Sequence, residues 1–170
     1  MTRQDKKQPE PLVKSEVLKE ALSRATKGDV DDDLSISFRV AGGVSEQHYR
    51  LVLRTMGGRL DTCTLDCMRS DCHGGANRGT IDSKTMSSLH RSLLRSEFLS
   101  TTTEPPRFLP DTLVGIIEII SGENTHSVYF AADPDQAEVQ GLSTPAAVLE
   151  AAEALYKAAG KILDIKDVRP

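Results

Sequence analysis

The residues whose types could do chemistry in one place are three cysteines and a histidine within eleven positions. Cys63, Cys67, Cys72 and His73 all carry atoms that bind Zn²⁺, and the first two cysteines have a spacing that zinc sites use. Standard zinc sites contain two such pairs, and adjacent Cys72 and His73 cannot easily both reach one tetrahedral ion. Three hypotheses therefore stay open for this segment: ordinary thiols in a loop, a zinc site and a redox-responsive site.

Serine, histidine and aspartate are also present, but no motif typical of a catalytic site joins them. The sequence contains no Gly-x-Ser-x-Gly, His-Glu-x-x-His, Walker A or Gly-x-Gly-x-x-Gly pattern. His48, His90 and His126 fall in three different predicted elements, and His90 is expected to be a packed histidine at a helix edge. We therefore expect a protein that is not an enzyme and has no cofactor, apart from a possible zinc ion.

Length and charge limit the classes of partner. The 170 residues are enough for one domain with a modest core, which must be aliphatic because there is no Trp. The net charge of −4 gives no electrostatic reason to expect nucleic acid or an anionic membrane. No apolar run approaches the roughly 20 residues of a membrane helix, and the N-terminus does not resemble a secretory signal. We expect a cytoplasmic protein with a protein partner.

The clearest strand signals come in two pairs, each of which predicts an antiparallel hairpin. Residues 35–40 and 49–54 alternate apolar and polar side chains and are joined through the Gly42-Gly43 pair. Residues 113–120 and 128–132 are rich in apolar side chains and are separated by turn-forming residues. Because apolar residues fall on both faces of 113–120, this hairpin is expected at the centre of the sheet, with both faces covered.

Three segments place apolar side chains at helical spacing: residues 12–25, 82–99 and 145–159. Asp82 is a suitable N-cap for the second helix, and Gly160 is expected to end the third. Residues 57–80, which hold all three cysteines, show no regular pattern and are expected to form a loop.

Together these elements predict an α+β fold. It has a small four-stranded, mainly antiparallel sheet built from two hairpins, with two packed helices and an N-terminal helix. Residues 1–33 are expected to be a flexible tail with a short helix. Residues 34–165 are expected to be a single α+β domain with a Cys-containing loop at 57–80.

Several segments resemble one protein family. The strand and Gly-Gly turn from Ile36 to Val44, the helix from Leu89 to Phe98, and Pro110-Asp111 followed by a strand, a turn and Val128-Tyr129-Phe130 are similar to the emfourin-like proteins. The resemblance covers the chain from Ser35 to Leu163. Emfourins inhibit thermolysin-type zinc proteases of the protealysin kind. The resemblance therefore implies an inhibitor that occludes the active site of such a protease.

If the protein is such an inhibitor, loops at the edge of its sheet would enter the active-site cleft. The candidate contact loop consists of Gly42, Gly43, Val44 and Ser45, and Asp111 is a second candidate whose carboxylate could approach the protease zinc. Residues 1–33 and the cysteine segment have no counterpart in the family pattern. Two alternatives stay open: a metal- or redox-responsive domain that uses Cys63, Cys67, Cys72 and His73, and a general protein-interaction module.

Overall fold

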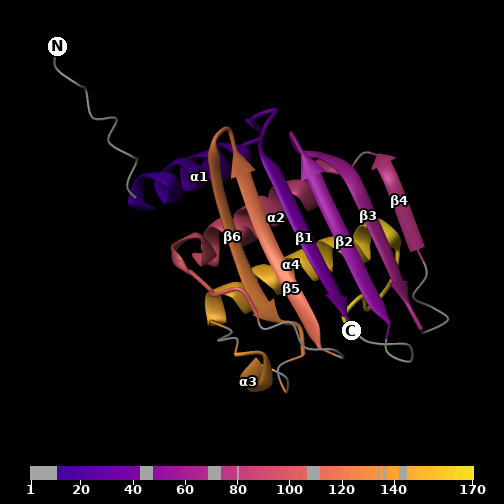
Figure 1. Ribbon diagram of the computed structural model, residues 1–170. Coiled ribbons are helices and arrows are strands. Elements are labelled where there is room, and N and C mark those ends of the chain that lie inside the picture. Colours follow the sequence, from indigo (N-terminus) through magenta and orange to yellow (C-terminus); the bar gives the residue numbers. More distant parts are fainter. Residues whose placement is uncertain are drawn as a thin grey trace, which may run out of the picture.

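The computed structural model describes residues 11–42, 48–68, 74–79, 81–106, 112–133, 135, 137–141 and 145–170. Within them six strands form one sheet: β1 (Ser35–Gly42), β2 (Tyr49–Met56), β3 (Arg59–Cys67), β4 (Gly74–Gly79), β5 (Leu113–Ser121) and β6 (Asn124–Ala131). The order is β4-β3-β2-β1-β5-β6, and every neighbouring pair is antiparallel (Figure 1). The predicted α+β class and mainly antiparallel sheet are confirmed.

The prediction of four strands was wrong, because β3 and β4 lie in the segment 57–80 that was expected to be a loop. The turn from β2 to β3 is Gly57-Gly58, and both glycines have positive φ, as tight hairpin turns require. In β3 the side chains of Cys63, Leu65 and Cys67 alternate inward. This alternation was a readable strand signal, whereas glycine-rich β4 carries none.

The position predicted for the second hairpin was also wrong. β5 and β6 do form a hairpin around Gly122, but β6 is last in the strand order, and β2 and β1 occupy its middle. Only one face of β5 is fully buried, since Ile117 and Ile119 are inaccessible to solvent, whereas Ile116 and Ile120 are partly exposed. Apolar residues on both faces of a strand therefore did not mean that both faces are covered.

Helices cover one face of the sheet. They are α1 (Pro11–Ala25), α2 (Ser83–Arg95) and α4 (Ala146–Leu163), with short α3 (Ala137–Gln140) beside the end of β6 and a 3₁₀ turn η1 (Phe98–Ser100) (Figure 1). Under the helices Phe38 of β1 stacks on Phe130 of β6, with ring centroids 6.1 Å apart, and meets Tyr156 of α4 edge-on at 5.0 Å. The predicted cap is confirmed, because Asp82 accepts a hydrogen bond of 2.8 Å from the Thr85 N–H.

The N-terminal helix packs into this core. Leu18 and Leu22 of α1 are fully buried, and Arg24 at its end donates to Asp31 over 2.8 Å. Residues 11–33 therefore belong with the domain rather than with a separate tail, while residues 1–10 lie outside the described residues. Among the described helices, none combines the length and apolar character needed to cross a membrane.

The buried His90 and the partly buried His126 determine how stability is expected to depend on pH. Burial lowers the pKa of His90 and His126 below the ordinary 6.5, an effect partly offset by nearby backbone carbonyls. The unfolded chain therefore binds more protons, so the free energy of unfolding should fall as the pH drops from about 7.5 to about 5.5. In urea unfolding the double variant His90→Gln, His126→Gln should lose less stability over this range, whereas the control Thr125→Gln, at an exposed position of β6 without a titratable group, should behave like the unmodified protein. Equal pH dependence in all three proteins would contradict this assignment.

Candidate functional site

Gly42, the first of the candidate contact residues, lies where several strands meet. It is the last residue of β1 and pairs with Tyr49 of β2 on one side and with Leu113 of β5 on the other. Tyr49 also pairs with Cys67 of β3, and the Ala132 N–H donates to the Leu113 carbonyl over 3.1 Å. These five residues mark one end of the sheet, called here the Gly42 end, which lies at the bottom of Figure 1.

The other candidate contact residues, Gly43, Val44, Ser45 and Asp111, lie outside the described residues. Their attachment points, however, are described. Residue 43 follows Gly42 directly, and residue 111 precedes Leu113 by two positions, while Gly42 and Leu113 are register partners. The two candidate segments therefore leave the sheet from adjacent positions on neighbouring strands.

The backbone at Gly42 is packed so closely that no side chain fits there. A Cβ atom at this position would lie 2.0 Å from the carbonyl oxygen of Thr112, and Gly42 has a φ of +155°. The obstacle is backbone rather than a flexible side chain. The backbone segments at Gly42 and Thr112 would therefore have to separate to admit even a methyl group. Glycine therefore allows the end of β1 to sit against the residue that leads into β5.

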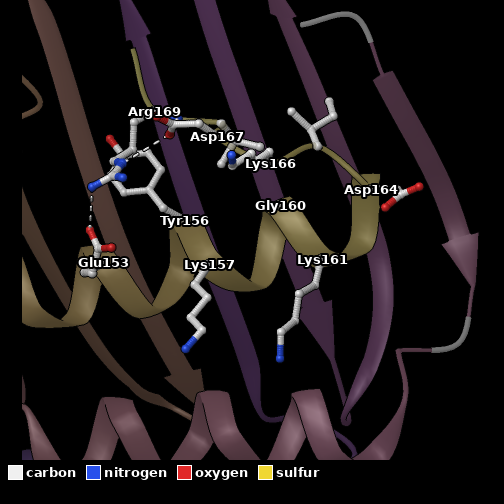
Figure 2. A pocket seen from close by; sticks show the side chains of 11 residues that line it. Glu153, Tyr156, Lys157, Gly160, Lys161, Asp164, Lys166, Asp167 and Arg169 are labelled. Carbon is white, nitrogen blue, oxygen red and sulfur yellow. Dashed lines mark hydrogen bonds and ion pairs between the residues drawn. The ribbon is translucent and has the colours of Figure 1, made fainter. Parts of the chain in front are cut away.

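The last residues of the sequence hold the other side of the Gly42 end. After α4, residues 164–169 fold back as a strap over the helix, and the Tyr49 hydroxyl donates to the Val168 carbonyl. Val168 is only 2% exposed, and Arg169 lies 3.4 Å from Glu153 and 3.2 Å from Asp167 (Figure 2). The strap therefore fixes the first residue of β2. Sequence reasoning missed it because an isolated apolar residue among charged ones has no periodicity.

A hollow of about 460 Å³ lies between the strap and α4. Its lining mixes both signs of charge, and the guanidinium of Arg169 is already paired with two carboxylates. Lys157 and Lys161 point away from the strap toward α2 (Figure 2). The charges that line this hollow do not converge on one point.

The cysteines of the candidate metal site are not brought together within the described chain. Cys63 is a buried free thiol whose pKa burial raises to about 12, whereas Cys67 is disulfide-bonded. Cys63 and Cys67 are four residues apart on one strand, so their Cα atoms are about 13 Å apart. Two thiolates that bind one zinc ion each lie only about 2.3 Å from the metal. One ion therefore cannot bind both. The predicted zinc site with all four ligands is therefore not formed. Cys72 and His73 lie outside the described residues, so a zinc site that uses only one of Cys63 and Cys67, and the redox hypothesis, stay predictions.

One further pair of side chains lies beside the Gly42 end. The Nε2 atom of His48, the residue just before β2, is 3.2 Å from a carboxylate oxygen of Asp66 on β3. The two residues are far apart in the sequence, so no local pattern could have predicted the contact. With side chains 47% and 61% exposed, the pair is weakly held and contributes little to stability.

Comparison with known proteins does not identify the chain: no protein-family model matches it, and no relative is found among curated proteins. The function of the chain therefore has to be inferred from the geometry of the Gly42 end. That geometry is a backbone platform, closely packed at Gly42 and strapped at Tyr49, from which two segments leave side by side.

Proposed function

We propose that the protein inhibits a thermolysin-type zinc metalloprotease by placing the Gly42 end of the sheet in the active-site cleft. The observation that carries the proposal is the register pairing of Gly42 with Leu113. It places the points where the two candidate contact segments join the sheet, which lie far apart in the sequence, on neighbouring strands. In this proposal the chain acts by binding and performs no catalysis.

The packing of the Gly42 end supports this role. β1 is paired on both sides along its whole length, and β2 is tied to the strap at its first residue, Tyr49. A binding surface that is ordered before association loses less conformational entropy when it binds, which raises affinity. A firmly held base also limits the local opening that a protease needs in order to cleave an inhibitor.

The chemistry that an inhibitor needs at the protease zinc is an oxygen ligand. A carboxylate such as that of Asp111 can occupy the position of the zinc-bound water, because Asp and Glu oxygens bind Zn²⁺ at about 2.0–2.2 Å. Ser45, in the neighbouring segment, would contact the rim of the cleft. The proposal therefore gives Asp111 and Ser45 different roles: Asp111 would bind the metal and Ser45 would fit the shape of the cleft.

The test is a steady-state titration of a purified thermolysin-type protease with the full chain. Stoichiometric inhibition with a dissociation constant of about 10 nM or lower is expected. Asp111→Ala and Ser45→Arg should each weaken inhibition by about tenfold or more, which corresponds to about 1.4 kcal/mol of binding free energy. Glu123→Ala, in the exposed turn at the opposite end of the sheet, is the control and should inhibit like the unmodified protein.

Two outcomes would count against the proposal. The expected dissociation constant is about 10 nM. If the protease stays fully active when the folded protein is present at about a thousandfold that concentration, the protease is not its target. If it forms a stable complex without inhibition, the chain is an interaction module whose contact surface lies away from the active site.

A further inference from the structure

The outward side of β5 is mostly apolar, although no described helix covers it. Helices α1, α2 and α4 all lie on the other face of the sheet (Figure 1). Ile117 and Ile119 point to these helices, so the residues that alternate with them point to the open face. They are Val114, Ile116, Glu118 and Ile120. A strand with one face in water normally carries polar side chains there, so β5 has the composition of a strand that is covered on both faces.

The apolar side chains of β5 belong to a row that crosses the open face. By register Ile116 lies between Tyr129 of β6 and Arg39 of β1, and Val52 of β2 lies on the far side of Arg39. Val52, Ile116 and Tyr129 are each partly exposed, and Arg39 is exposed. Three of the four side chains in this row therefore present apolar area to a partner.

The charged side chains of the open face lie as pairs of opposite sign on neighbouring strands. The pairs are Arg50 opposite Asp66, Arg54 at 3.9 Å from Asp61, and Arg39 diagonal to Glu118. Because the charges balance, the face does not select a strongly acidic or a strongly basic partner. A face with cations and carboxylates on adjacent strands is instead suited to a copy of itself, since a two-fold rotation can bring one strand onto the other.

We propose that two copies of the chain pack by their open faces, about a two-fold axis that runs parallel to the strands between β1 and β5. Such an axis places β1 on β5 of the partner and β2 on β6 of the partner, at the same level along the strands. Val52 then lies on Tyr129 of the partner subunit, and Arg39 lies on Ile116 of the partner subunit. The second copy covers the apolar side of β5, while the Gly42 end, at the ends of the strands, stays outside the contact.

Charge determines the choice of axis. An axis along β1 itself would place Arg39 against the same residue of the partner, and like charges in an interface are unfavourable. With the axis between β1 and β5, Glu118 lies opposite Ser37 of the partner subunit and next to Arg54 of the partner subunit. The Glu118 carboxylate accepts a hydrogen bond of 2.8 Å from Ser127 and has further lone pairs for a guanidinium.

The size of the contact sets the expected affinity. Four overlapping strands with a spacing of about 4.8 Å, each about eight residues long, give a contact of about 19 Å by about 26 Å. This is about 500 Å² on each partner, and the total of about 1,000 Å² is at the lower limit for a specific interface. The dimer is therefore expected to dissociate in the micromolar range.

The experiment measures the mass of the full chain by sedimentation between about 1 µM and about 500 µM, without protease. The mass should rise from that of one chain toward that of two. Ile116→Arg places a second arginine against Arg39 of the partner subunit and should raise the dissociation constant at least about tenfold. The control Leu149→Arg makes the same change of charge at a side chain that is 44% exposed on α4, on the helical side, and should dimerise like the unmodified protein.

An exchange of two side chains tests the position of the axis. The double variant Arg39→Ile, Ile116→Arg keeps one arginine against one isoleucine across the axis, so it should restore most of the affinity that Ile116→Arg loses. Circular dichroism and urea unfolding verify that each variant is folded.

Three results would overturn the inference: a chain that is monomeric at about 500 µM, a folded Ile116→Arg protein that dimerises like the unmodified protein, or a folded exchange variant that remains as weak as Ile116→Arg. None of these measurements depends on inhibition of a protease, so the dimer and the proposed function are tested separately.

Discussion

Replacing Gly42 with alanine is expected to weaken inhibition of the protease by about a hundredfold, which corresponds to about 2.8 kcal/mol of binding free energy. The added Cβ would lie 2.0 Å from the Thr112 carbonyl oxygen, so the end of β1 and the start of β5 must move apart. This separation would displace the segment that follows Gly42 from the segment that precedes Leu113, and these are the two segments proposed to contact the protease. Overpacking of this kind should also lower the free energy of unfolding by about 1 to 3 kcal/mol. Both quantities are measured, by protease titration and by urea unfolding.

The matched control for this change is Gly122→Ala, in the turn between β5 and β6 at the other end of the sheet. Gly122 has a φ of +58°, but an added Cβ would meet only the Asp33 carboxylate, at an ordinary contact distance of 3.6 Å. The left-handed backbone should cost about 1 to 2 kcal/mol of stability without moving the Gly42 end. A Gly42→Ala protein that is folded and inhibits as well as Gly122→Ala would show that the Gly42 end is not the contact surface.

Truncating the buried face of α1 should have the largest effect on stability. Leu18→Ala and Leu22→Ala each remove a fully buried side chain and should each lower the free energy of unfolding by about 2 to 5 kcal/mol. That is a large share of the roughly 5 to 15 kcal/mol by which a domain of this size is stable. Urea unfolding of each single variant, followed by circular dichroism, measures the loss.

Val17→Ala provides the comparison on the same helix. Its side chain is 38% exposed, so its truncation should change the free energy of unfolding by only about 0.5 kcal/mol. If Leu18→Ala and Leu22→Ala are no more destabilising than Val17→Ala, then α1 does not contribute to the core in solution.

The parts of the fold that were predictable have a strong local signal. The hairpin of β1 with β2 follows from alternation and a glycine turn, the hairpin of β5 with β6 from apolar runs divided by turn residues, and the start of α2 from the cap at Asp82. β4 was unpredictable because glycine-rich segments carry no apolar pattern and pair only when a neighbouring strand supplies partners. The place of β6 at the edge depends on pairing between distant segments, which periodicity does not encode.

Gly160 shows how one residue type can mislead. It was expected to end the last helix, but α4 continues to Leu163 and ends at Asp164 in the left-handed conformation. A Cβ at Gly160 would lie 2.9 Å from the Ile165 carbonyl oxygen, so this glycine allows the strap to pass close over the helix. Its role depends on a chain reversal downstream, which cannot be predicted from its immediate neighbours.

The candidate site was predictable only as separate pieces. The Gly-Gly turn and the Pro-Asp pair were visible in the sequence, but the strands that adjoin them are neighbours only through the pairing of Gly42 with Leu113, across 71 positions of the chain. The hydrogen bond from Tyr49 to Val168 spans an even longer separation. Contacts of this kind depend on the topology of the whole sheet and not on local propensity.

Competition with a small zinc-chelating inhibitor of the protease shows whether the Gly42 end occupies the active-site cleft, as we propose. The complex is followed by a binding measurement, such as calorimetry, rather than by activity. If both ligands need the same cleft, the apparent dissociation constant of the complex should rise in proportion to the concentration of the small inhibitor, once that concentration exceeds the small inhibitor's own dissociation constant. If the dissociation constant of the complex does not change while the small inhibitor saturates the zinc, both ligands bind at once and the Gly42 end does not occupy the cleft.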